Sequence, residues 1–158
     1  MIVVVMGVSG CGKSTVGQLL ASRLQVPFLD ADAFHPPANV AKMAAGTPLT
    51  DEDRRPWLEF LNRKLLEHKD AVLACSALKE RYRQALARGV ADCRFAHLRG
   101  SLELIRARLA ERKHRYMPAS LLESQFAALE PPRDAIDVDI AQPPEHCVEA
   151  ILARLGPR

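Results

Sequence analysis

The sequence predicts a three-layer α/β fold, in which helices cover both faces of a five-stranded parallel sheet. Short apolar segments alternate with segments of helical pattern along the 158 residues, and strands buried on both faces are apolar almost throughout. A glycine-rich loop between the first strand and the first helix supports the same architecture. The expected strands cover residues 2–6, 26–29, 71–75, 94–98 and 136–141, and the expected helices cover residues 13–24, 51–67, 79–88, 102–112, 119–129 and 144–155.

Local chemistry sets the boundaries of these elements. The run from Ile2 to Met6 is entirely apolar, which indicates a buried strand rather than a signal peptide. Acidic residues from Asp51 to Asp53 fit the first turn of the second expected helix, next to the positive end of its dipole. Proline pairs at 36–37, 131–132 and 143–144 mark loop boundaries or helix starts.

Two longer connections interrupt the alternation of strands and helices. Residues 33–56 follow the second strand, and residues 113–133 follow the fourth strand and its helix. In an enzyme that transfers phosphate, the first connection would hold the acceptor, and the second would form a mobile lid that excludes water. No internal repeat or second core is visible, so residues 1–158 are expected to form a single domain.

The most specific motif is G-x-x-x-x-G-K-S at residues 7–14, placed between a strand and a helix as a phosphate-binding loop requires. Its glycines let the backbone wrap a phosphate chain, Lys13 can reach the β and γ phosphates, and the Ser14 hydroxyl can bind Mg²⁺. This pattern predicts a bound nucleoside triphosphate. The expected contacts are Gly7, Val8, Ser9, Gly10, Cys11, Gly12, Lys13, Ser14 and Thr15.

Two acidic residues follow the second strand, close to the expected phosphate site. Asp30 and Asp32 are two residues apart, so in an extended chain both carboxylates would point to the same side. One carboxylate could support Mg²⁺ and the other could accept the proton of an attacking hydroxyl. We assign the metal to Asp30 and the hydroxyl to Asp32, although the pattern also permits the reverse order.

Candidate acceptor contacts come next along the chain. His35 stands at the entrance of the first long connection, where it is expected to contact the acceptor. Trp57 is the only tryptophan, and it could anchor its helix in the core, line the pocket, or do both. Arg54 could pair with a carboxylate, either that of the substrate or that of Asp51.

Basic residues supply further candidates. Lys79 and Arg83 are one helical turn apart and could recognise an anionic acceptor, although a solvated helix face would have the same spacing. Arg108 and Arg112 also share a helical face. Arginines supplied by a lid neutralise charge on the transferring phosphate, so we expect both to contact the nucleotide and Arg112 to take part in catalysis.

Composition and charge exclude several classes of function. The net charge is +3, and eight lysines or arginines lie between Arg88 and Arg115. Few aromatic residues accompany this basic cluster, so a polyphosphate ligand explains it better than nucleic acid does. No apolar run is long enough to span a membrane. The four cysteines lack the spacing of metal ligands, which favours reduced thiols and a cytoplasmic location.

Together these segments resemble the gluconokinase family of ATP-dependent kinases, and the resemblance covers essentially the whole chain. The phosphate loop alone is common to a superfamily, whereas D-x-D-x-x-H-P at 30–36 and C-S-A-L-K at 75–79 are more specific. The other matching segments are residues 6–14, 39–43, 46–51, 53–57, 82–83, 121–126 and 129–130. One departure lies in the expected lid, where His114 and Arg115 stand in place of the family's Gly-His pair.

The resemblance implies a phosphate-loop kinase fold like that of shikimate and nucleoside monophosphate kinases. It also implies ATP and Mg²⁺, transfer of phosphate to the 6-hydroxyl of D-gluconate, and a homodimer. Two alternatives remain open: a kinase for another small hydroxyl acceptor such as shikimate, and a nucleotide-binding module without catalysis. A guanine-specific Asn-Lys-x-Asp motif, which a GTPase switch would carry, is absent from the sequence.

Overall fold

The computed structural model describes residues 1–111 and 119–157. Its centre is one sheet of five parallel strands in the order β2-β3-β1-β4-β5. The strands are β1 (Ile2–Met6), β2 (Phe28–Asp30), β3 (Ala71–Ala74), β4 (Cys93–Arg99) and β5 (Ile136–Asp139). The helices are α1 (Lys13–Leu24), the 3-10 helix η1 (Ala31–Phe34), α2 (Pro37–Ala44), α3 (Asp51–Leu66), α4 (Glu80–Ala87), α5 (Leu102–Ala110), α6 (Ala119–Ala128) and α7 (Pro144–Leu155).

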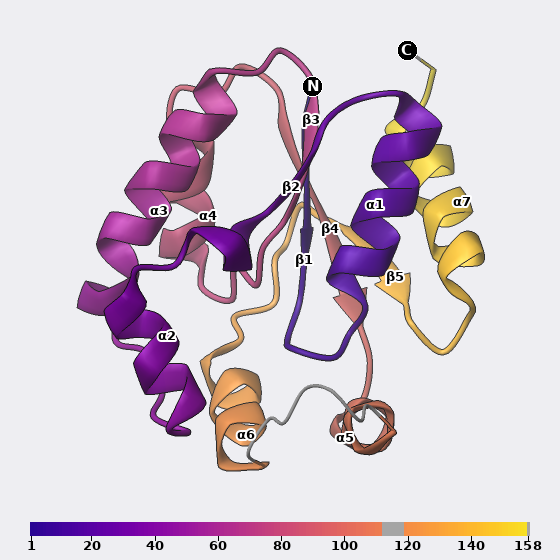
Figure 1. The fold of residues 1–158 in the computed structure, drawn as a ribbon. Coiled ribbons are helices and arrows are strands. Elements are labelled where there is room, and N and C mark those ends of the chain that lie inside the picture. Colours follow the sequence, from indigo (N-terminus) through magenta and orange to yellow (C-terminus); the bar gives the residue numbers. More distant parts are fainter. Residues whose placement is uncertain (112–118, 158) are drawn as a thin grey trace.

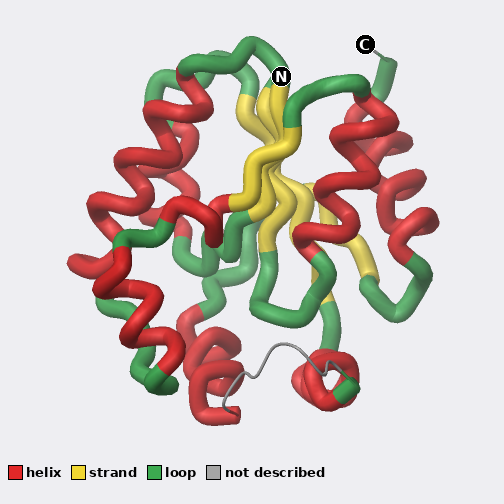
Figure 2. The backbone as a smooth tube through the Cα atoms, viewed as in Figure 1, coloured by secondary structure: helices red, strands yellow, loops and turns green. Residues whose placement is uncertain are grey.

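Helices cover the sheet from both sides, as Figures 1 and 2 show: α1 and α7 lie on one face, and α3 and α4 lie on the other. Successive side chains of a strand point to opposite faces, and the central strand β1 follows this rule. Val3 and Val5 pack in the core beneath α1 and α7, whereas Ile2, Val4 and Met6 pack beneath α3 and α4. This arrangement confirms the predicted α/β fold with a five-stranded parallel sheet.

The expected elements agree with the structure, and none of their boundaries differs by more than two residues. Two short elements, η1 and α2, were not predicted, and both lie in the long connection after β2. Helix α2 begins at Pro37, whose missing N–H is tolerated in a first helical turn. Its eight residues bury only Asn39, so it lacks the apolar stripe by which a sequence pattern reveals a core helix.

The carboxyl ends of parallel strands meet at one edge of the sheet, and ligands bind outside this edge in open α/β folds. The phosphate loop after β1, η1 after β2 and the loop after β3 all lie there. Helices α2, α5 and α6 flank the same edge, at the bottom of the view in Figure 1. In the part of the chain that the structure describes, no helix has the length and apolarity needed to cross a membrane.

Candidate active site

The phosphate loop turns from β1 into α1 through glycines that hold left-handed backbone conformations. Gly12 has φ +97° and caps the start of α1, so Lys13 becomes the first helical residue. Gly10 has φ +85°, and a Cβ atom there would lie 2.9 Å from Cγ of Leu109 and 3.1 Å from Cγ2 of Ile105, both on α5. A larger residue at position 10 would strain the backbone and force the Leu109 side chain to move. Glycine at position 10 therefore allows the side chains of α5 to pack directly against the loop.

Two side chains of α1 extend from this loop. The Lys13 ammonium donates a hydrogen bond to the carbonyl of Val8 (3.1 Å), so it crosses the loop that would enclose the phosphates. The Ser14 hydroxyl donates to Oδ2 of Asp30 (3.1 Å). Hydroxyl and carboxylate oxygens are hard ligands that suit Mg²⁺, and this ion usually keeps water and phosphate oxygens as its remaining ligands. The residues that the structure describes contain no cluster of three His, Cys, Asp or Glu side chains that could hold a metal alone.

The expectation that Asp30 and Asp32 share one face of an extended strand is wrong. Strand β2 ends at Asp30, and the chain then enters the 3-10 helix η1. The Asp30 carboxylate caps this helix by accepting the backbone N–H of Asp32 (3.1 Å), a common role of aspartate that competes with extended structure. Asp30 therefore faces Ser14, while the Asp32 side chain is 64% exposed and lines the cavity beside the loop.

His35 and Trp57 form the wall opposite the phosphate loop. Their rings stack with centroids 4.0 Å apart and planes 15° from parallel. The indole N–H of Trp57 donates to the carbonyl of Ala31 (2.8 Å), which ties α3 to η1. Trp57 is only 2% exposed, yet it also lines the cavity, so it serves both of the roles considered for it.

Asn39 of α2 determines how His35 presents its ring nitrogens. The Asn39 amide nitrogen donates to the carbonyl of Asp53 (2.9 Å) and lies 3.3 Å from Nδ1 of His35. An NH₂ group that faces His35 requires Nδ1 to accept, which places the ring proton on Nε2, 4.0 Å from the Asp32 carboxylate. Burial lowers the pKa of His35 below its ordinary value of 6.5, which favours this neutral form.

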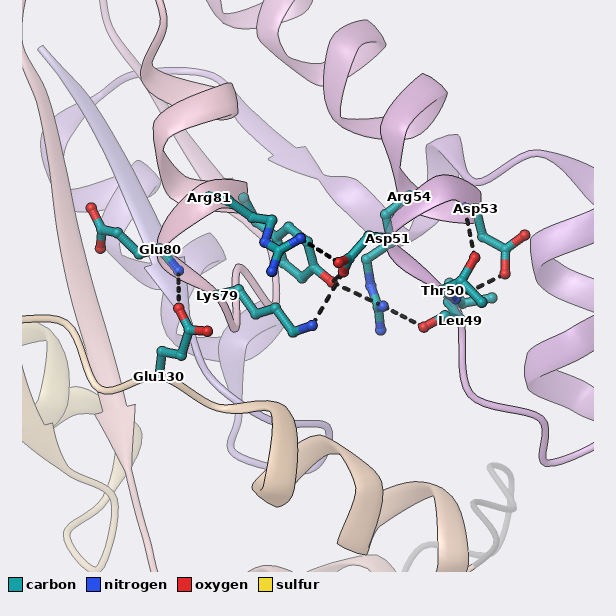
Figure 3. A network of polar contacts seen from close by, with 10 residues as sticks. Leu49, Thr50, Asp51, Asp53, Arg54, Lys79, Glu80, Arg81 and Glu130 are labelled. Carbon is teal, nitrogen blue, oxygen red and sulfur yellow. Dashed lines mark hydrogen bonds and ion pairs between the residues drawn. The ribbon is translucent and has the colours of Figure 1, made fainter.

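Arg54 reaches the cavity from the first turn of α3. That turn is fixed by a capping box, in which Thr50 and Asp53 satisfy each other's backbone N–H groups. One guanidinium nitrogen of Arg54, Nη1, donates to the carbonyl of Leu49 (2.5 Å) and to the hydroxyl of Tyr82 (3.2 Å). Arg54 and Leu49 both line the cavity, and Figure 3 shows the hydrogen bond from the guanidinium to the Leu49 carbonyl.

Asp51 is the centre of a network of polar contacts with residues of α4 and its N-cap (Figure 3). Its carboxylate lies 3.2 Å from the ammonium of Lys79 and 2.5 Å from the guanidinium of Arg81, and it accepts a short hydrogen bond from the Tyr82 hydroxyl. The Tyr82 hydrogen bond is the main cause that lowers the pKa of Asp51, and burial raises the pKa of Tyr82 to about 12. Lys79 and Arg81 are thus paired with Asp51 outside the residues that line the cavity, whereas Arg54 lines it.

The expected pairing of Lys79 and Arg83 on one cationic face is wrong. Lys79 precedes the helix as the N-cap of α4 and pairs with Asp51. Arg83 is 3% exposed and donates to the carbonyls of Ala77 (2.7 Å) and Glu130 (2.8 Å). A buried guanidinium needs such partners. Arg83 therefore anchors the segment after α6 to the start of α4, and the structure does not bring it into the acceptor cavity.

A second, smaller cavity of about 290 Å³ lies behind the phosphate loop. Arg108 lines it and donates to the carbonyl of Ile140, which follows β5. Cys11 also lines it, and burial raises the pKa of its thiol, so this cysteine is not poised as a thiolate. Gly12 lines both cavities. Arg112, His114 and Arg115 lie outside the described residues, as does the first part of the expected lid.

The cavity that holds the phosphate loop is called the main cavity below. It has a volume of about 510 Å³ and joins the loop to the wall formed by η1 and α3. The predicted residues that line it are Ser9, Gly10, Gly12, Lys13, Ser14, Thr15, Asp32, His35, Arg54 and Trp57. Gly7 and Val8, at the start of the loop, are buried instead. Residues that sequence reasoning missed include Asn39, which orients His35, and Gln125 of α6, which forms hydrogen bonds with Ser9 in the phosphate loop. Gln125 lies in segment 121–126, which resembles the gluconokinase family, but the helical pattern of this segment does not indicate a role for its side chain.

A phosphate loop that shares one cavity with an acidic side chain and an arginine defines a phosphate-loop kinase of small molecules. The comparisons with known proteins agree, since residues 9–135 match the family model "Shikimate kinase". The chain is 50% identical to a gluconokinase of Gluconobacter oxydans (83% of this chain, 76% of the relative) and 47% identical to a probable gluconokinase of Xenopus tropicalis (88% and 86%).

A solved gluconokinase structure from Sinorhizobium meliloti superposes with a TM-score of 0.91 at 43% identity, covering 97% of this chain and 90% of that one. The chain therefore belongs to the gluconokinase family. This result confirms the resemblance on which the sequence-based predictions of fold and activity were built.

Proposed function

We propose that this protein transfers the γ-phosphoryl group of ATP to the 6-hydroxyl of D-gluconate, giving 6-phospho-D-gluconate and ADP. One observation carries the proposal: a single cavity brings Lys13 of the phosphate loop together with Asp32 and Arg54. The relatives named gluconokinase, at 47–50% identity, support the choice of acceptor. The guanidinium of Arg54 in the cavity supports it as well, because gluconate is an anion.

The donor would lie along the phosphate loop. Its terminal phosphates would meet Lys13 and the loop backbone, and the adenosine would extend past Gly12 toward the smaller cavity that Arg108 lines. Ser14 and Asp30 would hold Mg²⁺, directly or through water. When bound, this ion neutralises charge that develops on the β and γ phosphates.

The acceptor would lie between the loop and the wall of His35 and Trp57. Asp32 would receive the proton of the 6-hydroxyl as the acceptor oxygen bonds to the γ-phosphorus and the bond to the leaving ADP oxygen breaks. The Nε2–H of His35 faces Asp32 and would orient its carboxylate. Among the described residues, Arg54 donates hydrogen bonds through Nη1, and its Nη2 would be left for the substrate carboxylate at the far end of the sugar acid.

Three wider properties belong to this proposal. Family membership supports a homodimer, which sedimentation analysis would test. The four cysteines are free, which is consistent with a cytoplasmic location. The continuous sheet with its two helical layers supports a single domain over residues 1–158.

An assay of ADP release across a panel of acceptors tests the activity. With ATP and Mg²⁺, gluconate should support faster turnover than other aldonic acids, shikimate or nucleoside monophosphates. Preference for shikimate or a nucleotide would assign the chain to another small-molecule kinase. Nucleotide binding with ADP release that no acceptor stimulates would indicate a module without kinase activity.

A further inference from the structure

Gln125 of α6 forms two hydrogen bonds with one residue of the phosphate loop, although the two residues are 116 positions apart in the sequence. Its side-chain oxygen Oε1 accepts the backbone N–H of Ser9 (2.7 Å), and its nitrogen Nε2 donates to the Ser9 hydroxyl (3.1 Å). Both Gln125 and Ser9 line the main cavity together with Lys13. The contact thus lies on the surface where the terminal phosphates are expected.

The fold seats α6 firmly enough to give this contact a fixed geometry. Leu121 and Leu122, one turn before Gln125, are 5% and 2% exposed. The segment after the helix is held at Glu130, whose backbone N–H donates to the carbonyl of Leu78 (2.8 Å) and whose carboxylate accepts the backbone N–H of Glu80 (2.9 Å). Gln125 is therefore presented to the loop from an anchored helix.

The chemistry of the amide fixes which way Gln125 points. A backbone N–H can be accepted only by the side-chain oxygen, so the NH₂ group must face the Ser9 hydroxyl. The bond to Ser9 uses one of the two hydrogens on Nε2. The second N–H is a neutral donor on the wall of the phosphate cavity. A negatively charged side chain at this position would repel the phosphates of ATP.

We propose that Gln125 is a positioning residue for phosphoryl transfer: it holds the phosphate loop at Ser9 in the conformation that receives the terminal phosphates of ATP. A loop that is already ordered loses less conformational freedom when the nucleotide binds, and its donors need less rearrangement in the transition state. The inference rests on the nucleotide-binding half of the proposed function and is independent of which acceptor the enzyme uses.

Three variants test this role by steady-state kinetics. Gln125→Ala should lower kcat/KM for ATP roughly tenfold to a hundredfold, which is the effect of losing two hydrogen bonds at a reacting site, while KM for gluconate changes less than about twofold. Gln125→Glu can still accept both Ser9 donors but adds a negative charge, and it should lose at least as much. Ser124→Ala is the matched control, since the Ser124 hydroxyl donates within α6, to the carbonyl of Leu121.

Hydrogen exchange and calorimetry separate this role from a contribution to folding or to acceptor choice. In Gln125→Ala without nucleotide, the Ser9 amide should exchange faster while the amides of β1 keep their protection. Calorimetric titration with ATP and Mg²⁺ should give weaker binding for Gln125→Ala and Gln125→Glu and unchanged binding for Ser124→Ala. This result would hold even if gluconate proved not to be the acceptor.

Gln125→Ala with kcat/KM for ATP within about twofold of wild type would overturn the inference. If Gln125→Ala failed to fold, Gln125→Met would decide in its place by the same criterion, because methionine keeps the length of the side chain and forms neither hydrogen bond with Ser9.

Discussion

The two walls of the main cavity hold their ligands with different parts of the chain. On the phosphate side, residues 7–15 supply backbone N–H groups, the Lys13 ammonium and the Ser14 hydroxyl that would bind Mg²⁺, and left-handed glycines set the shape of this stretch. On the acceptor side, the lining side chains come from η1, α2, α3 and the segment between η1 and α2, and partners on other elements orient several of them. Asn39 orients His35, and Tyr82 helps to orient Arg54.

This difference predicts different consequences of mutation. Changes on the phosphate side should lower turnover, because they remove charge stabilisation that the transferred group needs with any acceptor. Changes on the acceptor side should alter the affinity for gluconate and the choice among acceptors, with less effect on ATP. Asp32 is the exception, because it would take the proton of the acceptor and its loss should lower turnover. The following variants test whether the two walls are separable in this way.

The largest effect is expected at Lys13. Replacing it by alanine removes the ammonium that crosses the loop to the Val8 carbonyl, so charge on the β and γ phosphates loses its partner. We expect kcat to fall by about 10³-fold or more, with an unchanged melting temperature. Lys64→Ala, in α3 and away from the cavity, is the control and should turn over normally. Turnover close to wild type in Lys13→Ala would contradict the assigned role.

Asp32→Asn should have the next largest effect. The amide keeps the shape of the side chain but cannot accept the hydroxyl proton, so kcat should fall by about 10²- to 10⁴-fold. ATP affinity, measured by calorimetry, should stay within a factor of about two, because Asp32 contacts neither the loop nor Ser14. Equal losses in turnover and ATP affinity would instead give Asp32 a role in metal binding or folding.

Arg54→Gln should act mainly on the acceptor. Losing a charged hydrogen bond to a carboxylate should raise KM for gluconate by about 10- to 100-fold, while KM for ATP stays nearly constant. Tyr82→Phe removes only the hydroxyl that accepts from Arg54 and should raise KM by a few-fold.

The neutral amide of gluconic acid sharpens this test, because Arg54→Gln should reduce the preference for the acid over its amide. Arg63→Gln, an exposed change on the same helix, should leave that preference intact. An unaltered preference in Arg54→Gln would show that the carboxylate binds elsewhere.

The smallest expected effect is on the pH dependence of stability. Burial lowers the pKa of His35 below 6.5 in the folded state, so the unfolded chain takes up this proton first as the pH falls. The free energy of unfolding should therefore decrease from about pH 6.5 down to the lowered pKa, by at most about 1.4 kcal/mol per pH unit from this group.

Denaturant unfolding at pH 7.5 and 5.5 measures the effect, and His35→Gln removes one titrating group as the comparison. His97, whose pKa burial lowers as well, remains in both proteins and contributes equally. A loss of stability that is no smaller in His35→Gln than in wild type would mean that His35 is not held in its neutral form.

The same contrast explains how far the sequence could predict the molecule. The five strands and the phosphate loop were predictable, because apolar runs and a contiguous motif encode them locally. The helix cap at Asp30, which separates its carboxylate from that of Asp32, could not be predicted, because an aspartate after an apolar run can either continue the strand or cap a helix. The partners of Arg83 and Gln125 depend on contacts across 47 and 116 residues, which spacing along one element cannot reveal. Residue type suggested a ligand for Arg83, whereas its burial shows a structural anchor.

A crystal structure with gluconate and a non-hydrolysable ATP analogue tests the central claim most directly. The account predicts the triphosphate against Lys13 and the phosphate loop, the 6-hydroxyl between Asp32 and the γ-phosphorus, and the gluconate carboxylate on Arg54. Gluconate bound outside this cavity, or bound with its carboxylate at Asp32 and its 6-hydroxyl away from the nucleotide, would contradict it.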